Sequence, residues 1–286
     1  MRILHLIQRY WPAIGGAEAY LHELSTHFAA DGHHVVVATT DALDFELFWD
    51  PRRRRVDRPD ENHAGIEIRR FPVRHLPFPQ LGYPAWRRLL WILSRVKPVP
   101  TPWMHYLARF TPYVPDLWRW LNETQEAFDL VGGVTICFEP ISTAGLAFAR
   151  RRHIPFVAHP LTHFGAGPRP GEDTLSRFYT MRHQVETVVR ADGLVGMTET
   201  ERDYYVQRGA PAHNAIVAGP GLHFDDLLGG DSERFRRAHN ISGPIVASLG
   251  SMSIDKGTVH TVQAVRRLWQ QGQDVELVLA GSVLSP

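Results

Sequence analysis

The sequence has little cysteine and no long apolar run, and both absences narrow the class of protein. One Cys among 286 residues excludes a disulfide framework and a zinc site built on several cysteines. The apolar run that follows Met1 is too short for a signal peptide. No stretch reaches the roughly 18 uncharged apolar residues that a membrane-spanning helix needs. These features predict a cytoplasmic chain in a reducing compartment.

The net charge is only +1, and several common catalytic motifs are missing. Lys and Arg number 31 and Asp and Glu 30, so no global basic field indicates a nucleic-acid partner. The sequence lacks G-x-G-x-x-G after its first apolar run, a Walker A motif, H-E-x-x-H and G-x-S-x-G. No Asp-x-Asp pair is present to hold a divalent ion against a diphosphate. We therefore expect no metal and no nicotinamide cofactor.

Short apolar runs rich in β-branched residues alternate with longer segments of helical spacing. The alternation predicts right-handed crossover units, and hence an α/β fold with a doubly wound parallel sheet. The predicted strands are residues 3–7, 34–39, 66–71, 130–134, 155–158, 193–197 and 215–218. The predicted helices between them are residues 17–30, 141–152, 175–190 and 199–208.

A second, similar unit begins late in the chain. Residues 245–249 predict a strand, 258–271 a helix and 275–280 another strand. We therefore predict a first domain over residues 1–220, a connection over 221–243 with a helix cap at Asp231, and a partial second domain over 244–286. A lone unit of that size is close to the limit below which a core becomes marginal.

Residues 72–121 fit the alternation poorly because they are rich in Pro and Trp. Within them, residues 84–93 predict a short amphipathic helix with a basic edge. Two interpretations stay open: a flap that touches a membrane surface or an amphipathic acceptor, and an insertion that packs its tryptophans on the domain. The run Arg52–Arg55, with acidic neighbours as far as Glu61, is interpreted as a solvated loop with balanced charge.

A glycine pair follows the first predicted strand. Gly15 and Gly16 stand directly before the predicted helix 17–30. Glycines allow close approach of the backbone, and the free N–H groups and dipole of a helix N-terminus favour an anion, typically phosphate. The pair also lies at the carboxyl end of the first strand, where doubly wound sheets bind ligands.

At this point the sequence resembles the family 4 glycosyltransferases. The resemblance begins at Arg9-Tyr10-Trp11-Pro12 and the following Gly15-Gly16-Ala17-Glu18. It continues in the segments 65–72, 198–202, 219–223, 250–257 and 277–281. The resemblance implies a GT-B fold of two Rossmann-like domains, a nucleotide-activated sugar as donor, and retention of the anomeric configuration. It also implies a hexosyltransferase-type activity of the kind used in polysaccharide biosynthesis.

Two histidines follow the strand predicted at residues 155–158. In the family, a His on this loop faces the donor sugar, and the register favours His163, with His159 second. A neutral imidazole there can hydrogen-bond the sugar or the leaving phosphate.

The loop 250–257 resembles the family's phosphate-binding loop. Transfer builds negative charge on the departing phosphate, which Lys, Arg and helix N-terminal amides can meet without a metal. Lys256 and Gly257 open the predicted helix 258–271 and are the candidates. Ser251 stands where the family has Arg, which leaves one phosphate donor fewer.

The function implied is transfer of a sugar from a nucleotide diphosphate sugar to a glycan, lipid or small-molecule acceptor. The alternatives are a GT-B sugar-nucleotide epimerase and a non-catalytic partner subunit of a polysaccharide assembly complex. The family's second domain places its nucleotide pocket and a pair of glutamates beyond the position of Gly281. Three explanations remain open: a truncated or split gene product, a subunit whose donor domain comes from a second chain, and a complete, shortened enzyme. Lipid contact by residues 84–93 would place the chain at the inner membrane face.

Overall fold

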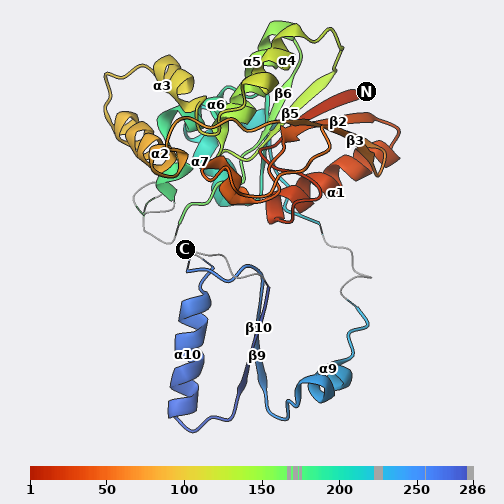
Figure 1. The fold of residues 1–286 in the computed structure, drawn as a ribbon, viewed down its shortest axis with the longest axis vertical. Helices are drawn as coiled ribbons and strands as arrows, with labels where there is room; N and C mark the ends of the chain where they lie inside the picture. The colour runs from red at the N-terminus through yellow and green to blue at the C-terminus, as the bar shows by residue number, and fades with distance from the viewer. Residues whose placement is uncertain (166–168, 170–172, 174–175, 222–227, 255, 282–286) are drawn as a thin grey trace. The chain divides into compact units, whose positions relative to one another are not determined.

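The computed structural model describes residues 1–165, 169, 173, 176–221, 228–254 and 256–281. The chain divides into two compact units, residues 1–221 and residues 222–286 (Figure 1). Each unit is described by itself.

The first unit is built on one eight-stranded sheet with the order β3-β4-β2-β1-β5-β6-β7-β8. All neighbouring strands are parallel except β3 and β4, which are antiparallel. The doubly wound α/β fold and seven of these strands are as predicted. The strands are β1 (Arg2–Leu6), β2 (His34–Thr40), β3 (Asp60–His63), β4 (Ile66–Phe71), β5 (Leu130–Val134), β6 (Phe156–His159), β7 (Gly193–Gly196) and β8 (Ala215–Val217).

Helices cover both faces of this sheet (Figure 1). Alternate residues of β2 show this directly, because Val36 belongs to one core cluster while Val35 and Val37 belong to another. The helices are α1 (Gly16–Ala30), α2 (Pro79–Arg95), α3 (Thr101–Ala108), α4 (Pro115–Glu123), α5 (Glu139–Arg152), α6 (Arg182–Val189) and α7 (Glu199–Val206). Short 3₁₀ turns lie at η1 (Phe45–Phe48), η2 (Ser176–Phe178) and η3 (Ala212–Asn214).

One local expectation was wrong, and two expected helices have other bounds. Asp60 and Glu61 belong to the edge strand β3 rather than to a loop, and buried Arg70 of β4 holds that strand by an ion pair of 2.7 Å with Glu61. The helix expected at 84–93 is the longer α2, which starts at Pro79. Pro suits a first helical position, since it has no N–H to leave unpaired. The helix expected at 175–190 is the shorter α6, and residue 175 lies outside the described residues.

The Pro/Trp-rich segment 72–121 packs on the first unit. Trp86 and Trp91 lie against a small core made by Leu90, Ala108 and Met181. Trp118 and Trp120 pack against the main core. For these four tryptophans the packing interpretation is confirmed, whereas Trp103 on α3 is 63% exposed.

The second unit contains a strand–helix–strand element with parallel strands, as predicted. Its elements are α9 (Ser232–His239), β9 (Ile245–Leu249), α10 (Thr258–Gln270) and β10 (Glu276–Ala280), with β9 and β10 parallel. Helix α9 lies inside the segment expected as a connection. The carboxylate of Asp231 caps it by accepting a hydrogen bond of 2.8 Å from the N–H of Arg234. His223, part of the resembling segment 219–223, lies outside the described residues.

Among the described residues, no helix has the length and apolar character needed to cross a lipid bilayer.

Candidate functional site

The carboxyl ends of β1, β5, β6 and β7 lie at one edge of the first sheet, because these strands are parallel. Strand β1 has β2 on one side and β5 on the other, so the chain order reverses between β1 and β5. Open α/β sheets bind ligands outside the carboxyl edge at such a switch point. The loops after these four strands therefore form the candidate site of the first unit.

The two glycines after β1 serve different purposes. A Cβ on Gly15 would lie 2.1 Å from a carboxylate oxygen of Glu18 and 2.9 Å from Arg9, whereas a Cβ on Gly16 would meet nothing within 4 Å. Glu18 and Arg9 form an ion pair of 2.7 Å in which Glu18 is buried. Gly15 thus makes room for this pair, which already places a carboxylate at the helix N-terminus. The open approach for a ligand is at Gly16.

His159, at the end of β6, is part of the buried frame of this edge. Its Nδ1 lies 2.8 Å from the hydroxyl of Tyr20 on α1, and the residue is 7% exposed. Burial lowers the pKa of His159 to about 4. On the neighbouring β1, burial together with His159 lowers the pKa of His5 to about 3, and His5 Nδ1 lies 2.9 Å from the hydroxyl of Ser25. Both imidazoles are therefore neutral at neutral pH.

The loop that leaves β6 is tied to α7 by two polar residues. The buried carboxylate of Glu201 accepts hydrogen bonds from the N–H groups of Thr162, at 2.5 Å, and Met197, at 2.8 Å. The hydroxyls of Thr162 and Tyr205 lie 2.7 Å apart. Glu201 thereby joins the loops after β6 and β7, and it fixes the backbone next to His163.

His163 is half-buried on this fixed loop. The N–H of Gly165 donates to His163 Nδ1 over 3.1 Å, and the ring centroids of His163 and Tyr179 are 6.0 Å apart. Because Nδ1 is an acceptor, the neutral ring carries its proton on Nε2. The imidazole can therefore donate one hydrogen bond from Nε2 to an oxygen of a ligand.

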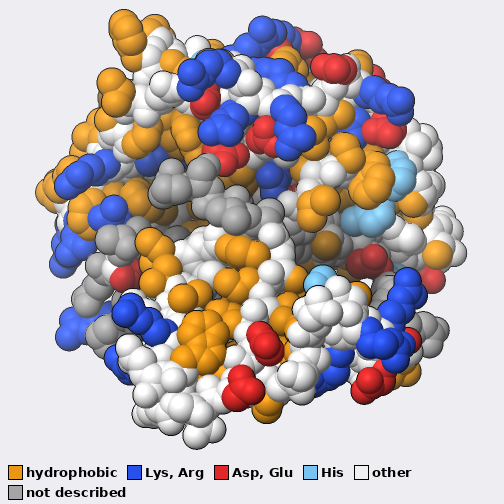
Figure 2. Space-filling view, turned by 60° about the horizontal axis from the view of Figure 1, so that its bottom comes forward, with side chains coloured by type: hydrophobic (Ala, Val, Ile, Leu, Met, Phe, Trp, Pro, Cys, Tyr) orange, Lys and Arg blue, Asp and Glu red, His pale blue; other side chains and the backbone are white. Residues whose placement is uncertain are grey.

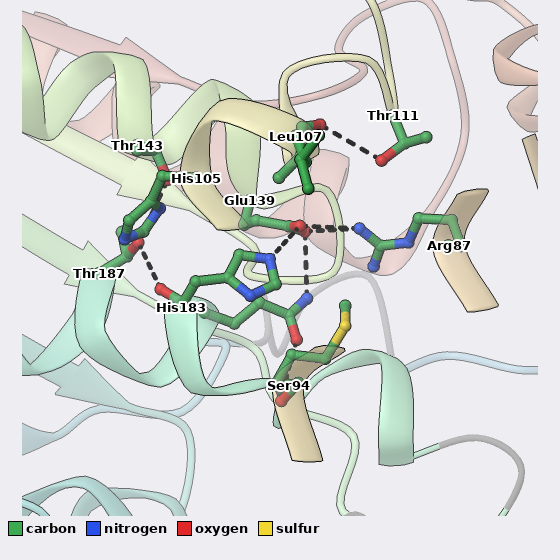
Figure 3. Close-up of polar contacts among 12 residues, drawn as sticks. Arg87, Ser94, His105, Leu107, Thr111, Glu139, Thr143, His183 and Thr187 are labelled. Carbon is green, nitrogen blue, oxygen red and sulfur yellow. Dashed lines mark hydrogen bonds and ion pairs between the residues drawn. The ribbon is translucent and has the colours of Figure 1, made fainter. Parts of the chain in front are cut away.

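A buried charged cluster lies under the loop after β5. Figure 3 shows Arg87 of α2 and His183 of α6 converging on Glu139, the first residue of α5. Arg87 Nη1 lies 2.8 and 2.9 Å from the two carboxylate oxygens, His183 Nε2 lies 2.8 Å from one of them, and Gln184 donates to the other over 3.1 Å. Burial alone would raise the pKa of Glu139, but Arg87 and the His183 hydrogen bond lower it below its usual value.

This cluster also attaches the segment 72–121 to the sheet. Arg87 donates further hydrogen bonds to the carbonyl groups of Cys137 and Phe178. An ion pair removed from water stabilises a protein only when its geometry is good and further hydrogen bonds meet its polar atoms. Here Arg87 and Glu139 both make further hydrogen bonds, while Nδ1 of His183 is buried without one. Helix α2 is therefore held in a defined position beside the carboxyl edge.

The candidate residues of the second unit lie at the carboxyl edge of its own two strands. A Cβ on Gly281, after β10, would lie 1.9 Å from the carbonyl oxygen of Gly250, after β9. Since Gly281 also has a φ of 145°, only glycine fits this crossing. Ser251 follows half-buried, and the exposed Lys256 precedes Gly257, the N-cap of α10. A cation at a helix N-terminus is unfavourable by itself and favourable once an anion binds.

The predicted residues thus fall into two groups. Gly15, Gly16, His159 and His163 lie on the carboxyl edge of the first sheet, while Ser251, Lys256 and Gly257 lie on that of the second. Among the described residues, no three His, Cys, Asp or Glu side chains are grouped to hold a metal ion.

Sequence reasoning missed the residues that support the first group. Glu201 could have been found, because Thr198 and Glu201 form a T-x-x-E pattern at a helix start. In the structure the Thr198 side chain accepts from the Glu201 N–H over 3.2 Å. Nothing in the sequence pairs Glu139 with Arg87, which lie 52 positions apart.

Comparison with known proteins identifies the family of this chain. Residues 15–221 match the family described as glycosyl transferase 4-like domain, and the chain belongs to that family. A comparison with curated protein sequences finds no significant match. The similar solved structures described next support a GT-B fold of Rossmann-like units for this chain.

The solved structures similar to this chain include HepE of Anabaena in complex with UDP and glucose. It is 17% identical to this chain with a TM-score of 0.57. The match covers 99% of this chain and 61% of the HepE chain. The catalytic domain of starch synthase IV from Arabidopsis thaliana, bound to ADP and acarbose, is 12% identical with a TM-score of 0.53. The match covers 98% of this chain and 68% of the starch synthase chain. A glycosyltransferase from Rickettsia africae is 11% identical with a TM-score of 0.51, and the match covers 98% of this chain and 60% of the Rickettsia chain. The chain therefore spans 60–69% of the length of these similar proteins and of the other HepE structures.

Proposed function

We propose that the protein is a retaining glycosyltransferase that transfers a sugar from a nucleoside diphosphate sugar to a hydroxyl of an acceptor. The observation that carries the proposal is His163, whose loop is locked by Glu201 and whose Nδ1 is occupied by Gly165. An imidazole fixed in this way presents Nε2–H in one direction, which suits a hydrogen bond to the transferring sugar.

The roles of the remaining residues follow from their surroundings. Gly16 offers open backbone at the start of α1, whereas Gly15 is occupied by the Glu18–Arg9 pair. In the second unit, Lys256 and the N-terminus of α10 would stabilise the charge that develops on the diphosphate as its bond to the anomeric carbon breaks. We propose that these protein groups do this without a metal ion. His159 is left out of the ligand contacts because it is buried and bonded to Tyr20.

Solved relatives support the donor class. HepE has been crystallised with UDP and glucose and with UDP-glucose, and starch synthase IV with ADP and acarbose. By analogy, we propose a nucleoside diphosphate hexose as donor and a glycan or lipid-linked sugar as acceptor.

Titration calorimetry of the chain with UDP-, ADP-, GDP- and dTDP-hexoses tests donor binding, and product analysis of the same mixtures tests the reaction. The proposal predicts binding of one nucleotide class and release of its nucleoside diphosphate when an acceptor glycan is added. Conversion of the donor into its epimer would replace the proposal by the epimerase alternative. Absence of binding to every nucleotide would contradict the proposal and favour the alternative of a non-catalytic partner subunit.

Two substitutions separate the assigned roles in an active preparation. His163→Ala should lower turnover by at least about 100-fold because a directed hydrogen bond at the reacting sugar is lost. Lys256→Ala should weaken nucleotide binding by about 10-fold or more. The matched controls are His213→Ala, an exposed histidine of η3, and Lys97→Ala, which should each leave both quantities unchanged. Equal turnover of His163→Ala and His213→Ala would contradict the role of His163.

A further inference from the structure

Helix α2 packs Leu90 inward as an ordinary surface helix does, but it also buries an arginine and leaves large apolar side chains in water. Its inner face carries Arg87, which is buried in the ion pair with Glu139, and Ser94, whose hydroxyl accepts from the N–H of Arg182 over 3.0 Å. Its outer face carries large apolar side chains in water: Leu81 is 79% exposed, Leu89 40% and Ile92 46%.

The outer face is a continuous stripe. The spacing 81, 85, 88, 89, 92, 95 and 96 follows the helical repeat, and every one of these residues is exposed. We call these seven residues the α2 outer face. Its apolar members alternate with Arg88 and Arg95, and Arg95 lies 5.1 Å from the ring centre of Trp91. Beside it, Phe78 before the helix is 81% exposed.

The surrounding segment contains no acidic residue. Residues 68–115 hold eight Lys and Arg and no Asp or Glu, although the whole chain has 30 Asp and Glu. Helix α3, which packs with α2 around Leu90 and Ala108, exposes Trp103 and Tyr106 as well. Figure 2 shows hydrophobic and basic side chains side by side on the side of the molecule where α2 and α3 lie in Figure 1.

The helix is also fixed against the body of the first unit. Besides the Arg87–Glu139 pair, Arg182 donates to the carbonyl groups of Ser94, Val96 and Val99 at the end of α2. The exposed apolar side chains therefore lie on a rigid support, and they do not reach a core by rotation of the helix.

We propose that the α2 outer face docks the protein on an anionic lipid surface. Aliphatic and aromatic side chains with flanking arginines are the combination that inserts at the headgroup boundary of a bilayer with negative charge. A second copy of the chain is disfavoured as the occupant, because self-pairing of an acid-free face would bring arginines against arginines. The proposal does not rest on sugar transfer and is tested without turnover.

Sedimentation of the full chain with vesicles of phosphatidylcholine alone, or with about one third phosphatidylglycerol, tests this docking. We expect binding to the anionic vesicles only, and weaker binding as salt is raised. The double variant Leu89→Ser/Ile92→Ser and the double variant Arg88→Gln/Arg95→Gln should each weaken binding by about 10-fold.

Helix α10 offers a matched control. Val259→Ser/Val262→Ser removes two exposed aliphatic side chains with the same three-residue spacing, and should leave vesicle binding unchanged. Circular dichroism and urea unfolding verify that each variant folds. The proposal is overturned if the wild-type chain does not sediment with anionic vesicles, or if the α2 variants bind like the α10 control. It is also overturned if sedimentation velocity shows a dimer that only Leu89→Ser/Ile92→Ser dissociates, because the face is then a contact between copies.

Discussion

Strand β1 of the first unit and strand β9 of the second are similar apolar segments of a parallel sheet, yet their surroundings differ. Ile3, Leu4 and Leu6 of β1 are 0% exposed, whereas no residue of β9 is buried and Leu249 is 81% exposed. Strand β1 lies between β2 and β5 with helices over both faces, while β9 pairs with β10 within the described residues. Burial therefore depends on the neighbours of a strand more than on its own sequence.

The same difference applies to the polar groups. In the first unit, charged residues such as Glu139, Glu201 and Glu18 are buried and hydrogen-bonded, and they hold loops at the carboxyl edge. Among the described residues of the second unit only Val265 is buried. The first unit is thus a preorganised frame, and the described residues of the second unit provide little core to restrain the loop after β9.

The largest effect that distinguishes the two units is expected from Glu139→Ala. This substitution leaves Arg87 buried without its partner, and should reduce the free energy of unfolding by about 3–5 kcal/mol. The matched change in the second unit is Glu233→Ala, at an exposed residue of α9. It should change the free energy of unfolding of the first unit by about 0.5 kcal/mol or less. Seven of the eight tryptophans lie in the first unit, so urea unfolding followed by Trp fluorescence reports on it. A loss below about 1 kcal/mol for Glu139→Ala would mean that the pair does not hold α2 in place.

A smaller effect is expected from acidification. His5 and His159 have folded-state pKa values of about 3 and about 4, so between pH 7.5 and pH 5 the unfolded chain gains protons that the folded chain does not. The first unit should therefore lose about 2 kcal/mol of stability per histidine by pH 5. Glu139 does not contribute in this window, because its lowered pKa stabilises the fold at any pH above the ordinary value of 4.5.

The control for this pH dependence is His159→Gln, which should reduce the loss by about 2 kcal/mol. His239 and His260 of the second unit are exposed, so hydrogen exchange in β9 and β10 should report no comparable destabilisation between the two pH values. If the wild-type chain is equally stable at pH 7.5 and pH 5, these histidines are not buried in the neutral form.

The sequence predicted the elements whose burial is encoded locally. Apolar β-branched runs predicted seven strands of the first sheet. Central strands such as β1 and β2 are covered on both faces, whereas the edge strand β8 exposes Ile216 and Val217. It did not predict β3, whose residues Asp-Glu-Asn-His have no apolar alternation and which is held at the edge by Arg70 and Glu61. Nor could it give the start of α2, because either Pro79 or Pro84 suits a first helical position.

The candidate site was predictable in position but not in its internal contacts. Its histidines and glycines follow predicted strands, so the topology alone brings them to one edge. Its internal contacts depend on tertiary packing. Gly15 accommodates Glu18 and Arg9, and His159 is hydrogen-bonded to Tyr20, which lies 139 positions away in the sequence. Those contacts decide which histidine and which glycine can face a ligand.

The contrast between the two units, and the proposed ligand contacts, are tested by hydrogen exchange of the chain with and without a nucleotide sugar that binds in calorimetry. Without ligand, amides of β9 and β10 should exchange at least about 100-fold faster than those of β1 and β5, reflecting an opening free energy lower by about 3 kcal/mol. With ligand, residues 256–261 and 161–165 should become protected, because a ligand that binds the folded state stabilises the segments it contacts. Unchanged exchange in both segments at saturating ligand would contradict the proposed contacts of His163 and Lys256 with the donor.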